Sequence, residues 1–226
     1  MEQMNNSNLE ISMSEGALPL GLGGGTLSSD QLFLIWKYAQ ALTSPKLSDR
    51  KDGFQRLIEL NVINKSPLIV YLLATRIKEI DITLRAYIIK VLANILELKI
   101  PSDVSFSLTQ HTLAAYLSQI GKGEIHALIQ LVDVDPSSEE NIVRILCSCS
   151  CAGEYLNEVV FDRSVSTKSR QLAIMLLGQV GYLEAIPDLE RLENRIKTRV
   201  NPNSLGNEDK QLLPQIEEAL SLLRAP

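Results

Sequence analysis

The stretch Leu117–Gly121 reads LSQIG, and the stretch Leu177–Gly181, sixty residues later, reads LGQVG. Each copy closes a helical pattern, and a glutamate within three residues, Glu124 or Glu184, opens a second apolar run. Halfway between the copies, Ile145–Cys151 ends another helical stretch, which indicates a unit of helix, tight turn and helix with a period of about 30 residues. Such helix pairs cannot bury their apolar faces alone and must stack on their neighbours. We therefore expect an all-α solenoid of about ten or eleven helices.

The chain divides into a tail and one helical domain. Residues 1–27 are polar and then glycine-rich, with no regular periodicity, and predict a disordered acidic tail. Residues 28–226 form the predicted domain, which begins with the N-cap types Ser28, Ser29 and Asp30. No Lys or Arg precedes Lys37, so the basic region of a signal peptide is absent and we expect a cytoplasmic protein.

Composition and charge narrow the classes of partner. Hydrophobic residues make up 45% of the chain but aromatic residues only 5%, so the core must consist mainly of Leu, Ile, Val and Ala. The net charge is −5, of which residues 1–36 carry −4, leaving 22 basic and 23 acidic residues in a nearly neutral domain. Nucleic-acid binding is disfavoured, because it requires many neutralised phosphates. No apolar run approaches the roughly 20 residues that span a bilayer, so no membrane contact is expected.

Helix boundaries follow from caps and apolar periodicity. The expected helices or helix pairs span residues 32–42, 46–63 with 67–79, 81–98, 107–133, 138–162, 166–197 and 207–224, with a loop at 101–105. The repeat count slips between residues 61 and 106: either one unit has lost its second helix or the long helix replaces two short ones. In the first helix, Trp36 and Tyr38 are expected to pack in an end cap.

Charged pairs four residues apart offer a register mark. Asp52 with Arg56, Asp81 with Arg85, and Glu140 with Arg144 each place an acid before a base near a predicted helix start, the favoured orientation on a helix surface. In the last full unit Ser166 and Arg170 occupy the corresponding positions.

Residues 165–223 carry a family resemblance. VSTKSRQLAIMLLGQVGYLEAIPDLERLENRI followed by EDKQLLPQIEEALSLL is similar to HEAT repeats, in particular the short bacterial variety of phycobilisome chromophore lyases. The matching features are Arg170, the small Ala173, the LLGQVG helix end and Pro187 in the second helix. The resemblance implies a right-handed superhelix whose second helices line a concave surface that recognises proteins. Ser166 departs from the acid usual at that position.

No catalytic, metal or cofactor constellation is apparent. Cys147, Cys149 and Cys151 are too few for a four-ligand zinc site and are interpreted as small buried packing residues. His111 and His126 have no partner that would complete a catalytic triad. The run Gly21–Gly25 lacks the Lys-Ser or Lys-Thr ending of a phosphate-binding loop and follows no strand. We therefore expect no enzyme activity and no cofactor.

The remaining candidate is a basic cluster, and it leads to the expected function. Arg191, Arg195, Lys197 and Arg199 lie at the end of a predicted helix, where the helix dipole favours cations, or where an acidic partner could dock. The leading hypothesis is a non-enzymatic scaffold that holds a protein or peptide on the concave face. The alternatives are a lyase-type subunit acting on a protein-bound chromophore, by family analogy, and a DNA-binding HEAT-like protein, which the neutral domain disfavours.

Overall fold

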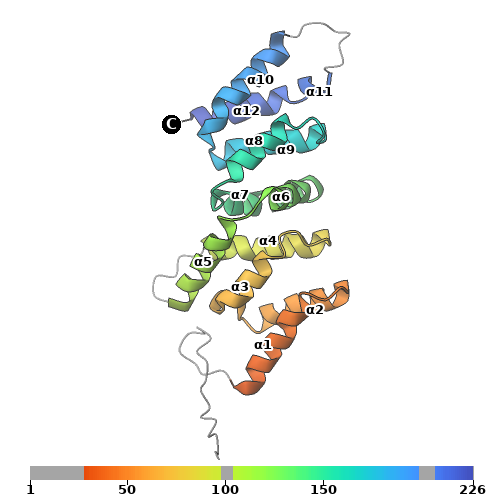
Figure 1. The fold of residues 1–226 in the computed structure, drawn as a ribbon, viewed down its shortest axis with the longest axis vertical. Helices are drawn as coiled ribbons and strands as arrows, with labels where there is room; N and C mark the ends of the chain where they lie inside the picture. Colours follow the sequence, from red (N-terminus) through yellow and green to blue (C-terminus); the bar gives the residue numbers. More distant parts are fainter. Residues whose placement is uncertain (1–27, 98–103, 199–206, 226) are drawn as a thin grey trace, which may run out of the picture.

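The structure, a computed structural model, describes residues 28–97, 104–198 and 207–225, and within these ranges it is helical and contains no β-strand (Figure 1). The predicted tail, residues 1–27, and Arg199 lie outside the described residues. The helices are α1 (Ser29–Ala41), α2 (Leu47–Glu59), α3 (Pro67–Ala74), α4 (Ile82–Glu97), α5 (Val104–Leu117), α6 (Lys122–Val134), α7 (Glu139–Cys147), α8 (Ala152–Phe161), α9 (Thr167–Val180), α10 (Ile186–Thr198), α11 (Asn207–Lys210) and α12 (Leu213–Arg224). Of these described helices, eleven have eight or more residues and α11 is a single turn.

The helices are arranged along the longest axis of the molecule broadly in chain order, except that α5 lies beside α3 and α12 lies between α9 and α10 (Figure 1). The extensive contacts join helices that are close in the chain, such as α1 with α2, α3 with α5, α4 with α7, and α9 with both α8 and α12. In the region where the repeat count slips, α4 is one continuous long helix that lies against α3, α5, α6 and α7.

The caps that the sequence indicates are present at several helix ends. The Ser28 hydroxyl oxygen accepts a hydrogen bond from the Gln31 backbone N–H, and the Gln31 side-chain oxygen accepts one from the Ser28 backbone N–H, as in a capping box. Ser66 caps α3, and Pro67 occupies its first turn, where no backbone N–H is required. Gly181 ends α9 in the left-handed conformation, with φ of 75°, so a glycine is favoured there as predicted.

The two copies of the repeated motif end their helices differently. In the second copy α9 runs through to Val180 before Gly181. In the first copy α5 already ends at Leu117, and Gly121 has an extended backbone, with φ of −107° and ψ of −172°, that starts α6. The carboxylate of Glu124 accepts a hydrogen bond from Gly121 N–H at 3.1 Å, which closes the start of α6. Each copy thus closes a helix, as expected, but the two helix ends have different backbone geometry.

Other boundaries also need correction. The helix expected at 46–63 ends at Glu59, because Asn61 adopts a positive φ of 52°. The helix expected at 67–79 ends at Ala74, and α5 begins at Val104, inside the predicted loop. The helical stretch expected to run to Cys151 ends at Cys147 in α7, and a turn separates α7 from α8.

Three arginines, Arg50, Arg85 and Arg170, each occupy the fourth position of their helix, in α2, α4 and α9. Arg85 Nε donates to the Glu79 backbone carbonyl at 2.6 Å, and Arg170 Nε donates to the Val160 carbonyl at 2.8 Å. Each guanidinium thereby satisfies an acceptor left over at the end of the preceding helical segment. The recurring feature is an arginine in the first turn of the helix, buried in α4 and α9 and half-buried in α2, that donates to backbone carbonyls of the preceding segment.

The surface pairs expected four apart are confirmed for Asp52 with Arg56, at 3.6 Å, and for Glu140 with Arg144, at 2.6 Å. The expected pair of Asp81 with Arg85 is wrong, because the Arg85 guanidinium points inward to backbone carbonyls. Asp81 instead caps α4 through Leu84 N–H and pairs with Lys51 at 3.3 Å.

The Glu79 carboxylate, 3% exposed, joins α2 to the start of α4. It accepts hydrogen bonds from Arg50 Nε and Nη2 at 3.0 and 2.7 Å and from Asp81 N–H at 3.2 Å. Burial alone would raise the pKa of Glu79, but the hydrogen bonds from Arg50 and Asp81 outweigh burial and hold that pKa below its usual range.

The core is built mainly of Leu, Ile, Val and Ala, with Phe54 and Phe106 as buried aromatics. Tyr38 packs partly against it, as expected, but Trp36 is 55% exposed, so the expectation that it packs in the end cap is wrong. In the described parts of the chain, no helix has the length and apolar character needed to cross a membrane.

Candidate functional site

A hollow of about 440 Å³ lies between α3, α5 and the start of α6. One side chain of α3 lines it, together with residues of α5, of the turn that follows and of the first turn of α6: Tyr71, Thr112, Ala115, Tyr116, Gln119, Ile120, Gly121 and Glu124. The first copy of the repeated motif thus supplies part of its wall. Because α5 ends early at Leu117, Gln119 and Ile120 lie in a turn that faces the hollow.

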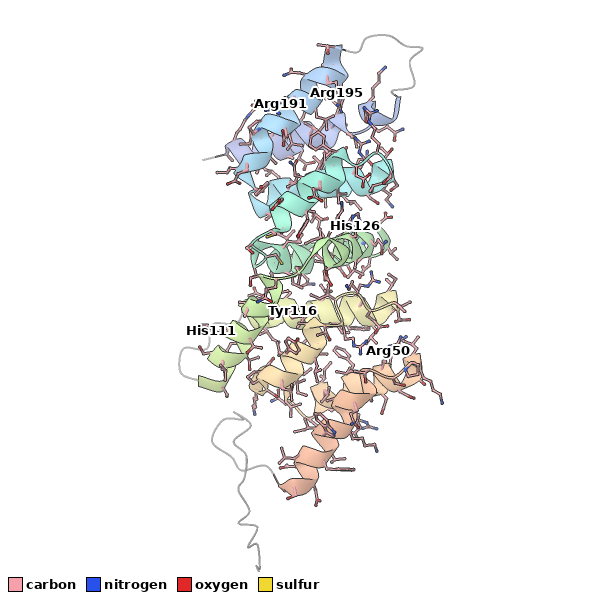
Figure 2. All side chains as sticks on the ribbon, in the orientation of Figure 1. Arg50, His111, Tyr116, His126, Arg191 and Arg195 are labelled. Carbon is pink, nitrogen blue, oxygen red and sulfur yellow. The ribbon has the colours of Figure 1, made fainter. Side chains whose placement is uncertain are left out.

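Two tyrosines form the aromatic side of the hollow. Tyr71 and Tyr116 meet edge to face, with ring centroids 5.6 Å apart and planes at 88°, the arrangement that aromatic quadrupoles favour. Tyr71 is 47% exposed and Tyr116 is half-buried. Figure 2 labels Tyr116 near the end of α5. Burial, and secondly the charge of Glu124, raises the pKa of Tyr116, so its phenol stays protonated and can donate a hydrogen bond.

An ion pair closes the polar side. Glu124 Oε1 lies 2.6 Å from Lys78 Nζ, and only 16% of the Glu124 side chain is exposed. Burial opposes ionisation of Glu124, but the hydrogen bonds from Lys78 and from backbone N–H groups outweigh it and lower its pKa. The hydrogen bond to Glu124 likewise raises the pKa of Lys78. The lining therefore carries one carboxylate whose charge is already balanced.

Uncharged polar groups complete the lining. Within the described residues, neither tyrosine hydroxyl nor the Gln119 side-chain amide makes a hydrogen bond, although Gln119 is exposed at the rim. Thr112 donates its hydroxyl hydrogen to the Leu108 carbonyl at 2.9 Å and keeps its oxygen available as an acceptor. These groups can donate to and accept from an amide backbone, and the lining includes no histidine or cysteine that could act as a nucleophile or base.

The basic residues that the sequence singles out lie elsewhere. Arg191 and Arg195 are on α10, far along the stack from the hollow (Figure 2). Arg191 is exposed and pairs with Asp188 at 3.2 Å, whereas Lys197 bridges Glu193 at 2.5 Å and Glu217 of α12 at 2.9 Å. Arg195 is half-buried, and Arg199 lies outside the described residues. Lys197 thus acts at least as a link between α10 and α12, and binding of an acidic partner by the cluster stays a prediction.

The histidines and cysteines are dispersed. His111 is exposed on α5, with its Nδ1 2.7 Å from the Ser107 carbonyl oxygen, and His126 lies on α6. Burial raises the pKa of the Cys149 thiol to about 12, as suits a packing residue. Cys147 is exposed, and Cys151 follows the helix end, so the expectation of three buried cysteines is wrong. Among the described residues, no group of three or more His, Cys, Asp or Glu is placed to hold a metal ion.

Comparison with known proteins finds no matching family model, no matching curated protein and no matching solved structure. Function must therefore be inferred from the residues themselves. The sequence alone does not predict the hollow, because residues of separate helices form its walls. The available signal was the pair of tyrosines in a chain with few aromatics, one of them immediately before the first repeated motif.

Proposed function

We propose that the protein is a non-enzymatic interaction module: a right-handed solenoid of HEAT-like helix pairs that binds a peptide segment of another protein in the hollow between α3, α5 and α6. The order of the helices along the long axis and the contacts between chain neighbours support the solenoid. The resemblance of residues 165–223 to HEAT repeats supports the same architecture.

The edge-to-face pair of Tyr71 and Tyr116 carries the proposal of binding. A half-exposed aromatic side chain fixed by a second aromatic ring presents a large contact area at a low entropic cost, which is why tyrosine is frequent among residues that dominate binding energy. The volume of about 440 Å³ falls in the range of small binding pockets and suits a few side chains of a peptide better than a folded domain.

The charge and polarity of the lining indicate the character of the peptide. Lys78 neutralises Glu124, so the hollow offers no unbalanced charge to an ionic side chain. The Gln119 side chain and the hydroxyls of Tyr71 and Tyr116 can form hydrogen bonds with the backbone amides of a peptide, while the two tyrosine rings can contact an apolar or aromatic side chain of that peptide. We accordingly propose an uncharged, extended segment with one apolar anchor residue as the ligand.

A random-peptide display library tests this assignment. The affinity of peptides selected on the wild-type protein is measured by fluorescence anisotropy for wild type, Tyr71→Ala, Gln119→Ala and the control Tyr87→Ala. Tyr87 is a matched control because it is 58% exposed on α4 but does not line the hollow. The loss of an anchor contact should weaken binding by about tenfold in Tyr71→Ala and leave Tyr87→Ala unchanged. Equal affinities for all variants would place the binding surface elsewhere, and Arg191→Glu would then test the basic cluster.

A further inference from the structure

Helix α1 exposes several large apolar side chains that its main neighbour, α2, does not cover. It lies at one end of the stack and packs chiefly on α2 (Figure 1). Of its thirteen residues only Ala39 is buried, although the sequence LFLIW runs through its first half. Phe33 is 68% exposed, Trp36 55% and Leu34 37%.

The exposed face of α1 has an ordered pattern of charge around its apolar centre. Asp30, Phe33, Leu34 and Lys37 follow the spacing i, i+3, i+4 and i+7, so they lie on one side of the helix. This side is opposite the stripe formed by Ile35, Tyr38, Ala39 and Leu42, which packs toward α2. Asp30 and Lys37 are both exposed, and neither forms an ion pair within the described residues.

This pattern is complementary to itself when reversed. If two α1 helices lie antiparallel with their two-fold axis between positions 33 and 34, Asp30 of each copy faces Lys37 of the other. Phe33 of each copy then faces Leu34 of the other. We propose that α1 is the interface at which two copies of this chain form a symmetric antiparallel helix pair. Such an isologous contact uses one patch on both copies and forms two ion pairs around one apolar centre.

The charges on α1 favour a second copy of α1 as the partner and favour the antiparallel orientation. A parallel pair would set Asp30 against Asp30 and Lys37 against Lys37, which costs free energy, whereas the antiparallel pair satisfies all four charges. One helix face per copy is smaller than the surface of a standard stable interface, so the dimer should be weak and should form in the micromolar range.

Charge reversal in the full chain tests the proposal by sedimentation velocity over a concentration series. Asp30→Lys alone and Lys37→Asp alone should each raise the dimer dissociation constant about tenfold or more, because each places like charges at both contacts. An equimolar mixture of the two variants should dimerise again as a heterodimer, since one chain is then basic and the other acidic at both positions. The double variant Asp30→Lys/Lys37→Asp should also dimerise.

The single tryptophan gives an independent readout on the same helix. Trp36 should shift its fluorescence to shorter wavelength as the wild-type chain dimerises, and Phe33→Asp should abolish both the shift and the dimer. All these substitutions alter exposed positions, and circular dichroism should show the helical fold retained.

Three results would overturn the proposal. One is a wild-type chain that stays monomeric to about 100 μM. The second is a mixture of the single variants that associates no better than either alone. The third is a monomer in which Trp36 is already shielded from acrylamide, which would mean that another part of the same chain covers this face.

Discussion

Replacing Glu79 by Gln should cost the protein about 3 kcal/mol of unfolding free energy at pH 7. The Arg50 guanidinium, only 12% exposed, would lose its charged acceptor and keep the carbonyls of Ser44 and Pro45 as partners. Breaking a buried ion pair by removing one partner costs about 3–5 kcal/mol, and the amide oxygen of Gln retains one acceptor, which places the value at the lower end. Urea unfolding followed by circular dichroism at 222 nm measures it.

Glu59 provides the matched control for this measurement. It also pairs with an arginine of α2, Arg56, at 2.9 Å, but the two side chains are 47% and 51% exposed. Water and salt screen such a pair, so Glu59→Gln should destabilise the protein far less than Glu79→Gln. If Glu79→Gln is no more destabilising than Glu59→Gln, the buried pair does not hold α2 to α4.

The pH dependence of the Glu79→Gln effect is a second check. The folded-state pKa of Glu79 is lowered, so its contribution is present above the unfolded-state pKa of about 4.3 and is lost as pH falls through the folded value. The gap between wild type and Glu79→Gln should be full at pH 7 and close in acid below about pH 4. A gap that widens in acid would refute the assignment.

Three further substitutions test packing and the hollow by urea unfolding. Gly178→Ala should destabilise the protein, because the new Cβ would lie 2.9 Å from Ala219 Cα. Overpacking costs about 1–3 kcal/mol and outweighs a helix-propensity gain of at most about 1 kcal/mol. The control Gly123→Ala makes only ordinary contacts and should not destabilise, and equal effects of the two substitutions would contradict the close approach of α9 and α12. Gly181→Val should cost about 1–3 kcal/mol through strain at positive φ, and no loss would contradict the helix end there. Glu124→Gln should destabilise at pH 7 but not below about pH 4, since the lowered pKa of Glu124 makes its contribution vanish in acid, and a loss that persists in acid would exclude the charge as its cause.

The sequence correctly predicts helix ends that depend on the residue at that position. Ser28, Pro67 and Gly181 start or end helices through their own hydrogen-bonding and backbone preferences, and each does so in the structure. The repeated motif indicated helical units, but its two glycines have different partners: Glu124 reaches back to Gly121, whereas Gly181 closes a left-handed turn. A shared sequence therefore did not dictate a shared helix end.

The non-local features could not be derived in the same way. Arg85 looks like the partner of Asp81 in the sequence, because four-residue spacing describes exposed helix surfaces and does not reveal which way a side chain points. Glu79 and Arg50 meet across a helix and two turns, and Tyr71 and Tyr116 meet only because α3 packs on α5. The hollow depends on such packing, and so no single stretch of sequence marks it.

The contacts between chain neighbours give the two ends of the stack different resistance to local opening. At one end α12 lies close on α9, where Gly178 admits Ala219, and also packs on α10. At the other end α1 packs chiefly on α2. Because contacts that reach only nearby helices allow one segment to open while distant ones stay folded, amide hydrogens of α1 should exchange with solvent earliest and those of α9 among the latest. Local unfolding would then begin at α1, and dimerisation through α1 would slow amide hydrogen exchange at the end that opens most easily.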